Sequence, residues 1–298
     1  MDKMRSHDAT VIETLIQSKT GVPADCEDCI HLSEHFIAVI DGATSKTQDR
    51  WDGKTSGRVA ADIIDATFHQ MPPDCTARQA ADRLTLAIRE FYRENDFEAE
   101  VMANPARRCT ASVVAISLFH KEVWSIGDCQ FMLGNQLFSV HKKVDEVVEE
   151  ARAFFLASEL LLNQAQVEDF LAHDTGRDFI QPLLARQHRF QNNPQAGSLY
   201  YAAVDGFSIP DDGVVVEPIP DDVTQIVLAS DGYPFLRQSL TESEQCLADL
   251  LQRDPLLFRD YKSTKGLVAG NASFDDRAYV KIRLDQIAGG RLESSHQI

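Results

Sequence analysis

Short apolar runs alternate with stretches of helical periodicity along this chain. Runs rich in Val, Ile and Ala at residues 35–41, 110–118 and 224–230 have the length of buried strands and are too short for helices. Residues 121–126 and 130–140 predict further strands, the second range as a hairpin that turns at Gly134-Asn135. The remaining expected strands are 11–17 (a strand or a helical turn), 198–204, 214–216 and 277–284. Consecutive strands with short links predict antiparallel pairing.

Helical periodicity follows the first of these strands. Residues 56–71 place their apolar side chains on one face, with Ser56 as the expected N-cap and Pro72-Pro73 as the stop. Thr76 and Gln79 have the spacing of a capping box, and a second apolar stripe follows them. Further helices are expected within 141–193, where Pro182 interrupts the pattern or opens another short helix, and at 241–252 and 255–268.

This order of elements predicts an α+β fold. The 298 residues contain no internal repeat and no convincing linker, so residues 1–298 are expected to form one domain. Residues 141–193 are interpreted as a helical insert between sheet regions, and residues from about 286 onward as a polar tail.

Composition and charge narrow the possible partners. Hydrophobic residues make up 44% of the chain and charged residues 25%, which is typical of a soluble globular protein. Lys and Arg number 29 against 46 Asp and Glu, a formal net charge of −17 that argues against nucleic-acid or anionic-membrane partners. The polar first ten residues are unlike a secretory signal, and no apolar stretch has transmembrane length. The six scattered cysteines then favour a cytoplasmic protein with reduced thiols, and the lone Cys26-x-x-Cys29 pair does not predict zinc.

Acidic residues recur at the ends of the predicted strands. Asp41-Gly42 ends the strand at 35–41, Asp231-Gly232 ends the strand at 224–230, and Asp128 follows the strand at 121–126. Asp275-Asp276 precedes the last strand. Four strand-end carboxylates in one chain predict a shared oxygen-rich site for hard divalent cations. The nine histidines show no ligand spacing, and His31 is expected to flank a strand.

The order of these motifs resembles the metal-dependent serine/threonine protein phosphatases of the phosphatase 2C (PPM) family, from about Glu27 to Leu284. The matching segments, in chain order, are Cys26-Glu27-Asp28, Asp41-Gly42, the small-residue helix start at 56–61, Cys109-Thr110-Ala111, Gly127-Asp128-Cys129-Gln130, Ser230-Asp231-Gly232 and Asp275-Asp276. The resemblance implies a four-layer α/β/β/α sandwich in which two antiparallel sheets are flanked by helices.

The resemblance also implies a site with two or three Mg²⁺ or Mn²⁺ ions. Asp41 would bridge two ions, Gly42 would lend its carbonyl to one, and Asp231 and Asp275 would bind the other. Asp128 with Asp231 would match a third ion position, and Glu27 would orient ligands through water. The implied reaction is direct attack of a metal-bridging hydroxide on phosphorus, without a phospho-enzyme intermediate.

Several positions depart from the family pattern. Gln130 stands where the family has Arg, Arg108 replaces a Gly, and Ala278 replaces a frequent Thr. The Arg that grips the substrate phosphate has no clear counterpart, and Lys19 is the nearest catalytic candidate. Alignment favours Asp275 over Asp276 as the ligand.

Three functions remain open. The first is hydrolysis of phosphoserine or phosphothreonine in a phosphorylated protein substrate. The second, motivated by the altered phosphate-gripping segment, is a catalytically weak phosphatase-like binding or regulatory module. The third is a small-molecule phosphomonoesterase on the same fold. The sequence does not determine the oligomeric state.

Overall fold

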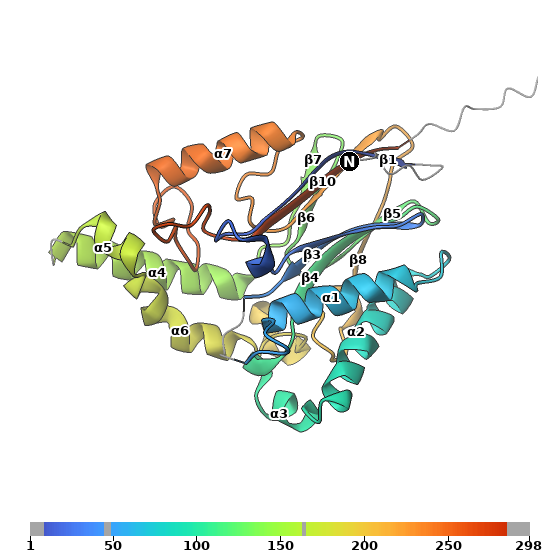
Figure 1. Ribbon diagram of the computed structural model, residues 1–298, viewed down its shortest axis with the longest axis horizontal. Helices are drawn as coiled ribbons and strands as arrows, with labels where there is room; N and C mark the ends of the chain where they lie inside the picture. The colour runs from blue at the N-terminus through green and yellow to red at the C-terminus, as the bar shows by residue number, and fades with distance from the viewer. Residues whose placement is uncertain (1–8, 45–48, 163–164, 285–298) are drawn as a thin grey trace, which may run out of the picture.

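Two five-stranded antiparallel sheets pack face to face in the computed structural model, which describes residues 9–44, 49–162 and 165–284 (Figure 1). The first sheet has the order β1 (Ala9–Gln17), β10 (Arg277–Leu284), β9 (Gln225–Ala229), β6 (Gln130–Leu133), β7 (Gln136–Phe138). The second has the order β2 (Cys29–Leu32), β3 (Phe36–Gly42), β4 (Ala111–Ser117), β5 (Glu122–Ile126), β8 (Val215–Pro218). The segment at 11–17 is therefore a strand, which settles the alternative left open by its sequence.

Helices cover the outer faces of both sheets, so the predicted α+β sandwich of four layers is confirmed. Helices α1 (Ser56–His69) and α2 (Ala77–Glu94) cover the second sheet, and α7 (Leu240–Arg253) lies over the first (Figure 1). The shorter helices are α3 (Glu98–Ala103) and the 3₁₀ turns Pro23–Asp25, Pro105–Arg107, Pro194–Leu199 and Asp211–Gly213. None of the described helices is long and apolar enough to cross a membrane.

Strand β3 shows why its sequence is apolar throughout instead of alternating. Phe36, Ala38 and Ile40 pack against α1 and α2, whereas Ile37 and Val39 pack into the core between the sheets. A central strand covered on both faces needs apolar residues at every position. The run ends at Asp41 because there the strand leaves the core.

Three further helices lie together at one end of the sandwich, within the range where the sequence predicted helices. They are α4 (Lys143–Leu162), α5 (Val167–Ala172) and α6 (Thr175–Gln187), and α4 packs against α6 (Figure 1). Pro182 lies inside α6, so the prediction that it breaks or opens a helix is wrong.

Other local predictions need correction. The N-cap of α1 is Thr55, whose side chain accepts the Arg58 backbone N–H, and not Ser56. Residues 198–204 form no strand, because Tyr201 and Val204 make only isolated bridges beyond a 3₁₀ turn. The sequence analysis also missed β2 and α3.

Residues 255–268 were predicted as a helix and instead form an irregular loop. The side chain of Asp254 accepts the backbone N–H groups of Phe258, Arg259 and Asp260. The backbone carbonyls of Leu256, Leu257 and Ser263 accept hydrogen bonds from the guanidinium group of Arg152. These backbone groups are therefore satisfied by side chains and not by a helical ladder.

The single-domain prediction for residues 1–298 stays a prediction, and the predicted polar tail from about 286 lies outside the described residues.

Candidate active site

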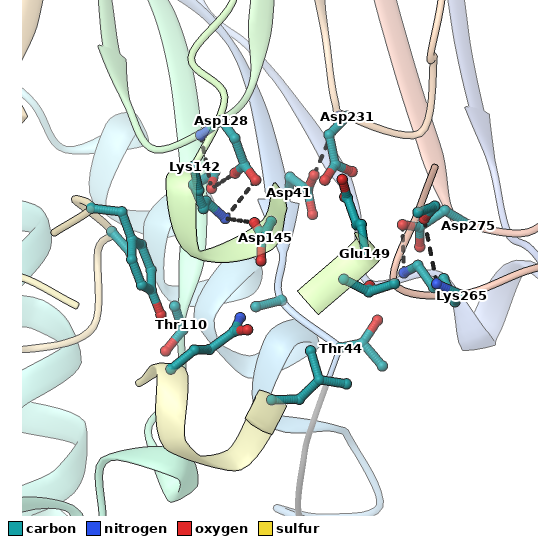
Figure 2. Close-up of a pocket in the computed structure, with 18 of the residues that line it drawn as sticks. Asp41, Thr44, Thr110, Asp128, Lys142, Asp145, Glu149, Asp231, Lys265 and Asp275 are labelled. Atoms are coloured by element: carbon teal, nitrogen blue, oxygen red, sulfur yellow. Dashed lines mark hydrogen bonds and ion pairs between the residues drawn. The ribbon is translucent and has the colours of Figure 1, made fainter. Parts of the chain in front are cut away.

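One cavity receives the side chains of all four strand-end acids. Asp41, Asp128, Asp231 and Asp275 line it, although they lie in four separate parts of the chain. Figure 2 shows Asp41 between Asp128 and Asp231, with Asp275 on the far side of Asp231. The predicted convergence of these carboxylates is therefore found in the structure.

The end of β3 depends on two glycines. Gly42 passes so close to Gly57 on α1 that an added Cβ would lie 2.5 Å from the Gly57 carbonyl oxygen and 2.6 Å from that of Glu27. A Cβ on Gly57 would lie 2.5 Å from the carbonyl oxygen of Ala43. Only glycine at both positions allows this backbone approach, which places Asp41 at the cavity.

Asp128 is held at the turn after β5. Gly127 adopts a φ of +96°, and the Ser112 hydroxyl on β4 donates to Asp128 Oδ1 at 2.5 Å. The ammonium group of Lys142 lies 2.5 Å from Asp128 Oδ2. Asp128 therefore already has a cationic partner supplied by the segment that leads into α4.

Asp231 follows β9 in a loop that buried polar groups fix. Gln130 on β6 donates its amide to the backbone carbonyls of Ser230 and Tyr233 at 3.1 and 2.7 Å. The backbone N–H of Asp231 points to Asp41 Oδ2 at 3.5 Å. The Gln found in place of the family's Arg thus supports the position of Asp231. Ser230, whose hydroxyl accepts the Ala278 backbone N–H, also has a supporting role here.

The two adjacent acids before β10 have different environments. Asp275 lines the cavity and forms an ion pair with Lys265. Asp276 is 3% exposed and accepts the backbone N–H groups of Lys19 and Glu27 at 2.8 and 3.1 Å. Asp275 therefore faces the cavity, whereas Asp276 ties β10 to the segment after β1, and Asp275 as the metal ligand stays a prediction.

Glu27, Asp28 and Lys19 lie beside the cavity and not in its lining. Lys19 Nζ lies 3.3 Å from Glu27 Oε2 and 3.1 Å from Asp276 Oδ2, so both partners hold the predicted phosphate-gripping lysine. Glu27 and Asp28 are buried, and Glu27 Oε1 and Asp28 Oδ2 each lack a hydrogen-bond partner among the described residues. Buried carboxylate oxygens without donors are costly unless a cation or water satisfies them.

Further charged residues that the motifs did not reveal complete the cavity. Asp145 and Glu149 come from α4, Lys142 from the segment before α4, and Lys265 from the irregular loop after α7 (Figure 2). Arg177 from α6 also lines the cavity. The periodicity of these segments predicted helices but gave no sign of their position. Six carboxylates and three cationic side chains thus line the cavity among the described residues.

Crowding of carboxylates raises several pKa values. Burial and the charges of Asp231 and Asp28 raise the pKa of Asp41 well above its ordinary value. The pKa of Asp231 rises to about 7, because the surrounding protein limits its hydration and because Asp128 and Asp275 lie near, although Asp231 keeps solvent contact. Burial and the charges of Asp145 and Asp231 raise the pKa of Glu149 to about 8.

The pKa values of Asp128 and Asp275 are lowered instead. Burial opposes ionisation of Asp128, but Lys142 outweighs it and lowers its pKa. Lys265, followed by Lys19, likewise lowers the pKa of Asp275 against the effect of burial. The cavity therefore combines two compensated carboxylates with Asp41 and Asp231, which have no cationic side chain within ion-pair distance among the described residues.

The donor set fits hard divalent cations in its chemistry. All candidate ligands are carboxylate or carbonyl oxygens, the type that Mg²⁺ and Mn²⁺ prefer. Burial and then the neighbouring carboxylates raise the pKa values of Asp41 and Asp231, and a bound cation would favour their charged forms. Within the described parts of the chain, however, only His31, Asp65 and His69 bring three ligand atoms within 4.8 Å of one another, and this group lies elsewhere.

No family model matches the chain, and no curated protein matches it either. Among solved structures, the serine/threonine phosphatase PstP/Ppp of Mycobacterium tuberculosis is similar at 16% identity and a TM-score of 0.46, over 93% of this chain and 99% of that chain. Serine/threonine phosphatase Stp1 of Staphylococcus aureus gives 12% identity and a TM-score of 0.46, over 95% and 96% of the two chains. RsbX in complex with magnesium gives 11% and 0.45, over 95% and 99%.

PstP/Ppp and Stp1 are bacterial serine/threonine phosphatases, the class that the sequence motifs resemble. At such low identity and TM-score, the function of this chain has to be argued from its own residues.

Proposed function

We propose that this chain is a Mg²⁺- or Mn²⁺-dependent phosphatase that hydrolyses phosphoserine or phosphothreonine in proteins. The observation that carries the proposal is the meeting of Asp41, Asp128, Asp231 and Asp275 in one cavity. Such a cluster of oxygen donors suits divalent cations and serves no evident packing purpose.

The residues that would hold the ions are Asp41, the Gly42 carbonyl, Asp231 and Asp275, with Asp128 and Asp231 at a third position. In two-metal phosphatases, the bound divalent cations neutralise the charge of the phosphate group and lower the pKa of a bound water molecule. Glu27 and Asp28, whose Oε1 and Oδ2 atoms have no hydrogen-bond partner among the described residues, would orient these ligands through water.

The chain's own cations would hold the phosphate group. Lys142, Arg177 and Lys265 line the cavity, and Arg177 is fixed by its bonds to the Thr264 carbonyl and hydroxyl at 2.7 and 2.8 Å. A phosphate dianion that enters the cavity can draw the ammonium groups of Lys142 and Lys265 away from their carboxylates. Lys19 would act from its ion pairs as a positioning residue for Glu27 and Asp276.

The test is hydrolysis of an aryl phosphate with Mn²⁺ by the wild type and by Asp41→Asn and Asp231→Asn. Each substitution removes an anionic ligand and is expected to lower kcat/KM by at least about a hundredfold, or about 3 kcal/mol. Asp178→Asn is the matched control, since Asp178 is exposed on α6 and pairs with His173. Turnover without added metal, or equal turnover in all variants, would contradict the proposal.

A specific observation favours the second candidate function, a phosphatase-like binding or regulatory module. Lys142 and Lys265 form ion pairs with Asp128 and Asp275 and neutralise their charge. Such counter-ions are expected in a centre that binds metal weakly. Calorimetric titration with Mn²⁺ separates the two functions: stoichiometric binding lost in Asp41→Asn supports the enzyme, and absent binding supports the module. Phosphopeptide and small-ester kinetics would then distinguish a protein phosphatase from a small-molecule phosphomonoesterase.

A further inference from the structure

A second group of metal-type ligands lies on the outer side of the second sheet, away from the acidic cavity. His31 lies within β2, and Asp65 and His69 are four residues apart on α1, so both face the same side of the helix. Cys29 and His31 alternate with Ile30 and Leu32, which pack into the core between the sheets, so His31 faces α1. The expectation that His31 flanks a strand is therefore wrong, because His31 lies within β2.

The three side chains converge closely. His31 Nδ1 lies 2.8 Å from Asp65 Oδ1, and His69 Nε2 lies 3.7 Å from Asp65 Oδ2. The two imidazole rings meet edge to face with their centroids 4.5 Å apart. One ligand atom from each residue lies within 4.8 Å of the others, a spacing that no other described trio of His, Cys, Asp or Glu achieves.

These distances suit a tetrahedral metal ion. Zinc bonds to imidazole nitrogen and carboxylate oxygen are about 2.0–2.2 Å, which places neighbouring ligand atoms about 3.4 Å apart. His31 Nδ1 is hydrogen-bonded to Asp65 Oδ1 at 2.8 Å, and His69 Nε2 lies 3.7 Å from the other oxygen of that carboxylate. These distances lie on either side of that value, and an ion would bind once side-chain movements open the hydrogen bond. Two imidazoles with one carboxylate form a borderline donor set that favours zinc over Mg²⁺.

The exposed fraction of the three side chains increases from His31 to His69. The side chain of His31 is 0% exposed, that of Asp65 31%, and that of His69 58%. The inner ligand is therefore held rigidly by β2, while the outer ligand leaves a side open for a water molecule as the fourth ligand.

We propose that His31, Asp65 and His69 form a zinc-binding site that joins β2 to the C-terminal turn of α1. The site is separate from the proposed catalytic centre. Gly57, which contacts the end of β3 beside Asp41, and His69 lie twelve residues apart on α1, or about 18 Å at 1.5 Å per residue. Zinc bound here would fasten the helix whose first turn positions the Asp41 loop.

The experiment is calorimetric titration of Zn²⁺ into the full chain carrying Asp41→Asn and Asp231→Asn, which weakens binding at the acidic cavity. We expect one equivalent of Zn²⁺ to bind, and His69→Ala or Asp65→Asn in the same background to weaken it by at least about tenfold. His69 is exposed, so its substitution leaves folding intact, and circular dichroism verifies this. His173→Ala is the matched control, because His173 pairs with Asp178 at 2.7 Å without a third ligand within the described residues.

A spectroscopic measurement identifies the ligands. The parent protein here is the full chain that carries Asp41→Asn and Asp231→Asn. With Co²⁺ in place of Zn²⁺, the parent and its His173→Ala variant should show the visible absorption bands of a tetrahedral site, and these bands should disappear in His69→Ala. The proposal is overturned if the parent binds Zn²⁺ no tighter than about 1 mM, or if His69→Ala and Asp65→Asn bind it as the parent does. Because the parent lacks Asp41 and Asp231, these outcomes do not depend on the proposed phosphatase activity.

Discussion

Two lysines divide the carboxylates of the cavity into paired and unpaired groups. Lys142 contacts Asp128 and Lys265 contacts Asp275, whereas Asp41 and Asp231 have no cationic side chain within ion-pair distance among the described residues. A divalent cation that uses Asp275 would therefore have to displace an ammonium group, and we expect this competition to lower the affinity of the proposed site for metal.

Substitution Lys265→Ala is expected to strengthen Mn²⁺ binding several-fold, because it removes the competitor for Asp275. The same change should weaken inhibition by inorganic phosphate, because a phosphate-facing cation is lost. Calorimetry with Mn²⁺ and inhibition constants for phosphate measure both effects. Lys262→Ala is the control, since Lys262 pairs with Glu150 in the same loop region at 2.6 Å. Unchanged or weaker Mn²⁺ binding in Lys265→Ala would contradict the competition.

Glu149 predicts how stability varies with pH in the metal-free protein. Its pKa is raised from 4.5 to about 8, first by burial and then by the charges of Asp145 and Asp231. The folded state thus keeps a proton that the unfolded chain has released, so this group makes stability fall as pH rises from about 4.5 to 8. The slope is at most about 1.4 kcal/mol per pH unit. In Glu149→Gln that fall disappears.

Urea unfolding in the presence of a chelator at pH 5, 7 and 9 checks this behaviour. The variant should match the wild type near pH 5 and exceed its stability at pH 9. Glu168→Gln, an exposed position on α5, should follow the wild type throughout. A constant difference between Glu149→Gln and the wild type at every pH would show that Glu149 titrates normally.

At the scale of elements, α4 and the loop after α7 form one unit through Arg152. Its side chain is fully buried, donates to the carbonyls of Leu256, Leu257 and Ser263, and forms an ion pair with Asp174 at 2.6 Å. This loop carries Lys265, and α4 carries Glu149. Arg152 therefore fixes the position of two cavity residues relative to each other without lining the cavity itself.

Arg152→Met is expected to lower the free energy of unfolding by about 3–5 kcal/mol, because it removes the cationic partner of Asp174 and the donor to three buried carbonyls. Amide hydrogen exchange should accelerate in residues 254–266. Urea unfolding and exchange monitored by mass spectrometry measure both effects. Arg93→Met, which breaks an exposed pair with Glu98, should change stability little. Equal effects of the two substitutions would mean that Arg152 does not organise the loop.

The same elements show what the sequence could predict. The strands were recognisable because β3, β4 and β9 are buried on both faces, which leaves unbroken apolar runs. The capping box of Thr76 and Gln79 is a local signal and was found. The loop after α7 was predicted as a helix because its apolar spacing is helical, while its backbone partners, Arg152 and the side chain of Asp254, act through contacts that spacing does not show.

The acidic cavity was predictable only in part for the same reason. Asp41, Asp128, Asp231 and Asp275 are marked locally by strand ends and adjacent glycines or acids. Lys142, Glu149 and Lys265 carry no local mark, and they reach the cavity because α4 and the loop pack across the end of the sandwich. The group of His31, Asp65 and His69 was not predicted, because His31 comes from a strand that the sequence analysis missed.

At the scale of the whole molecule, the cavity joins both sheets. Asp41 lies near the end of β3 and Asp128 follows β5, both in the second sheet, and Asp231 and Asp275 adjoin strands of the first. A cation shared by acids of both sheets would link the two layers of the sandwich. Metal binding is therefore expected to affect global unfolding and not only local structure.

Mn²⁺ should accordingly raise the free energy of unfolding of the wild type by about 2.7 kcal/mol when its free concentration is a hundred times Kd. Thermal unfolding in chelator and at increasing Mn²⁺ measures the effect as a rise in Tm. Asp41→Asn should abolish the rise in Tm, because it removes the carboxylate that is proposed to bind metal together with acids of both sheets. Asp178→Asn should retain the rise. His69→Ala should also retain the Mn²⁺ effect, since its histidine-containing site favours zinc. If Asp41→Asn gains as much stability from Mn²⁺ as the wild type does, the ions bind elsewhere on a chain of net charge −17, and the acidic cavity is not the metal centre.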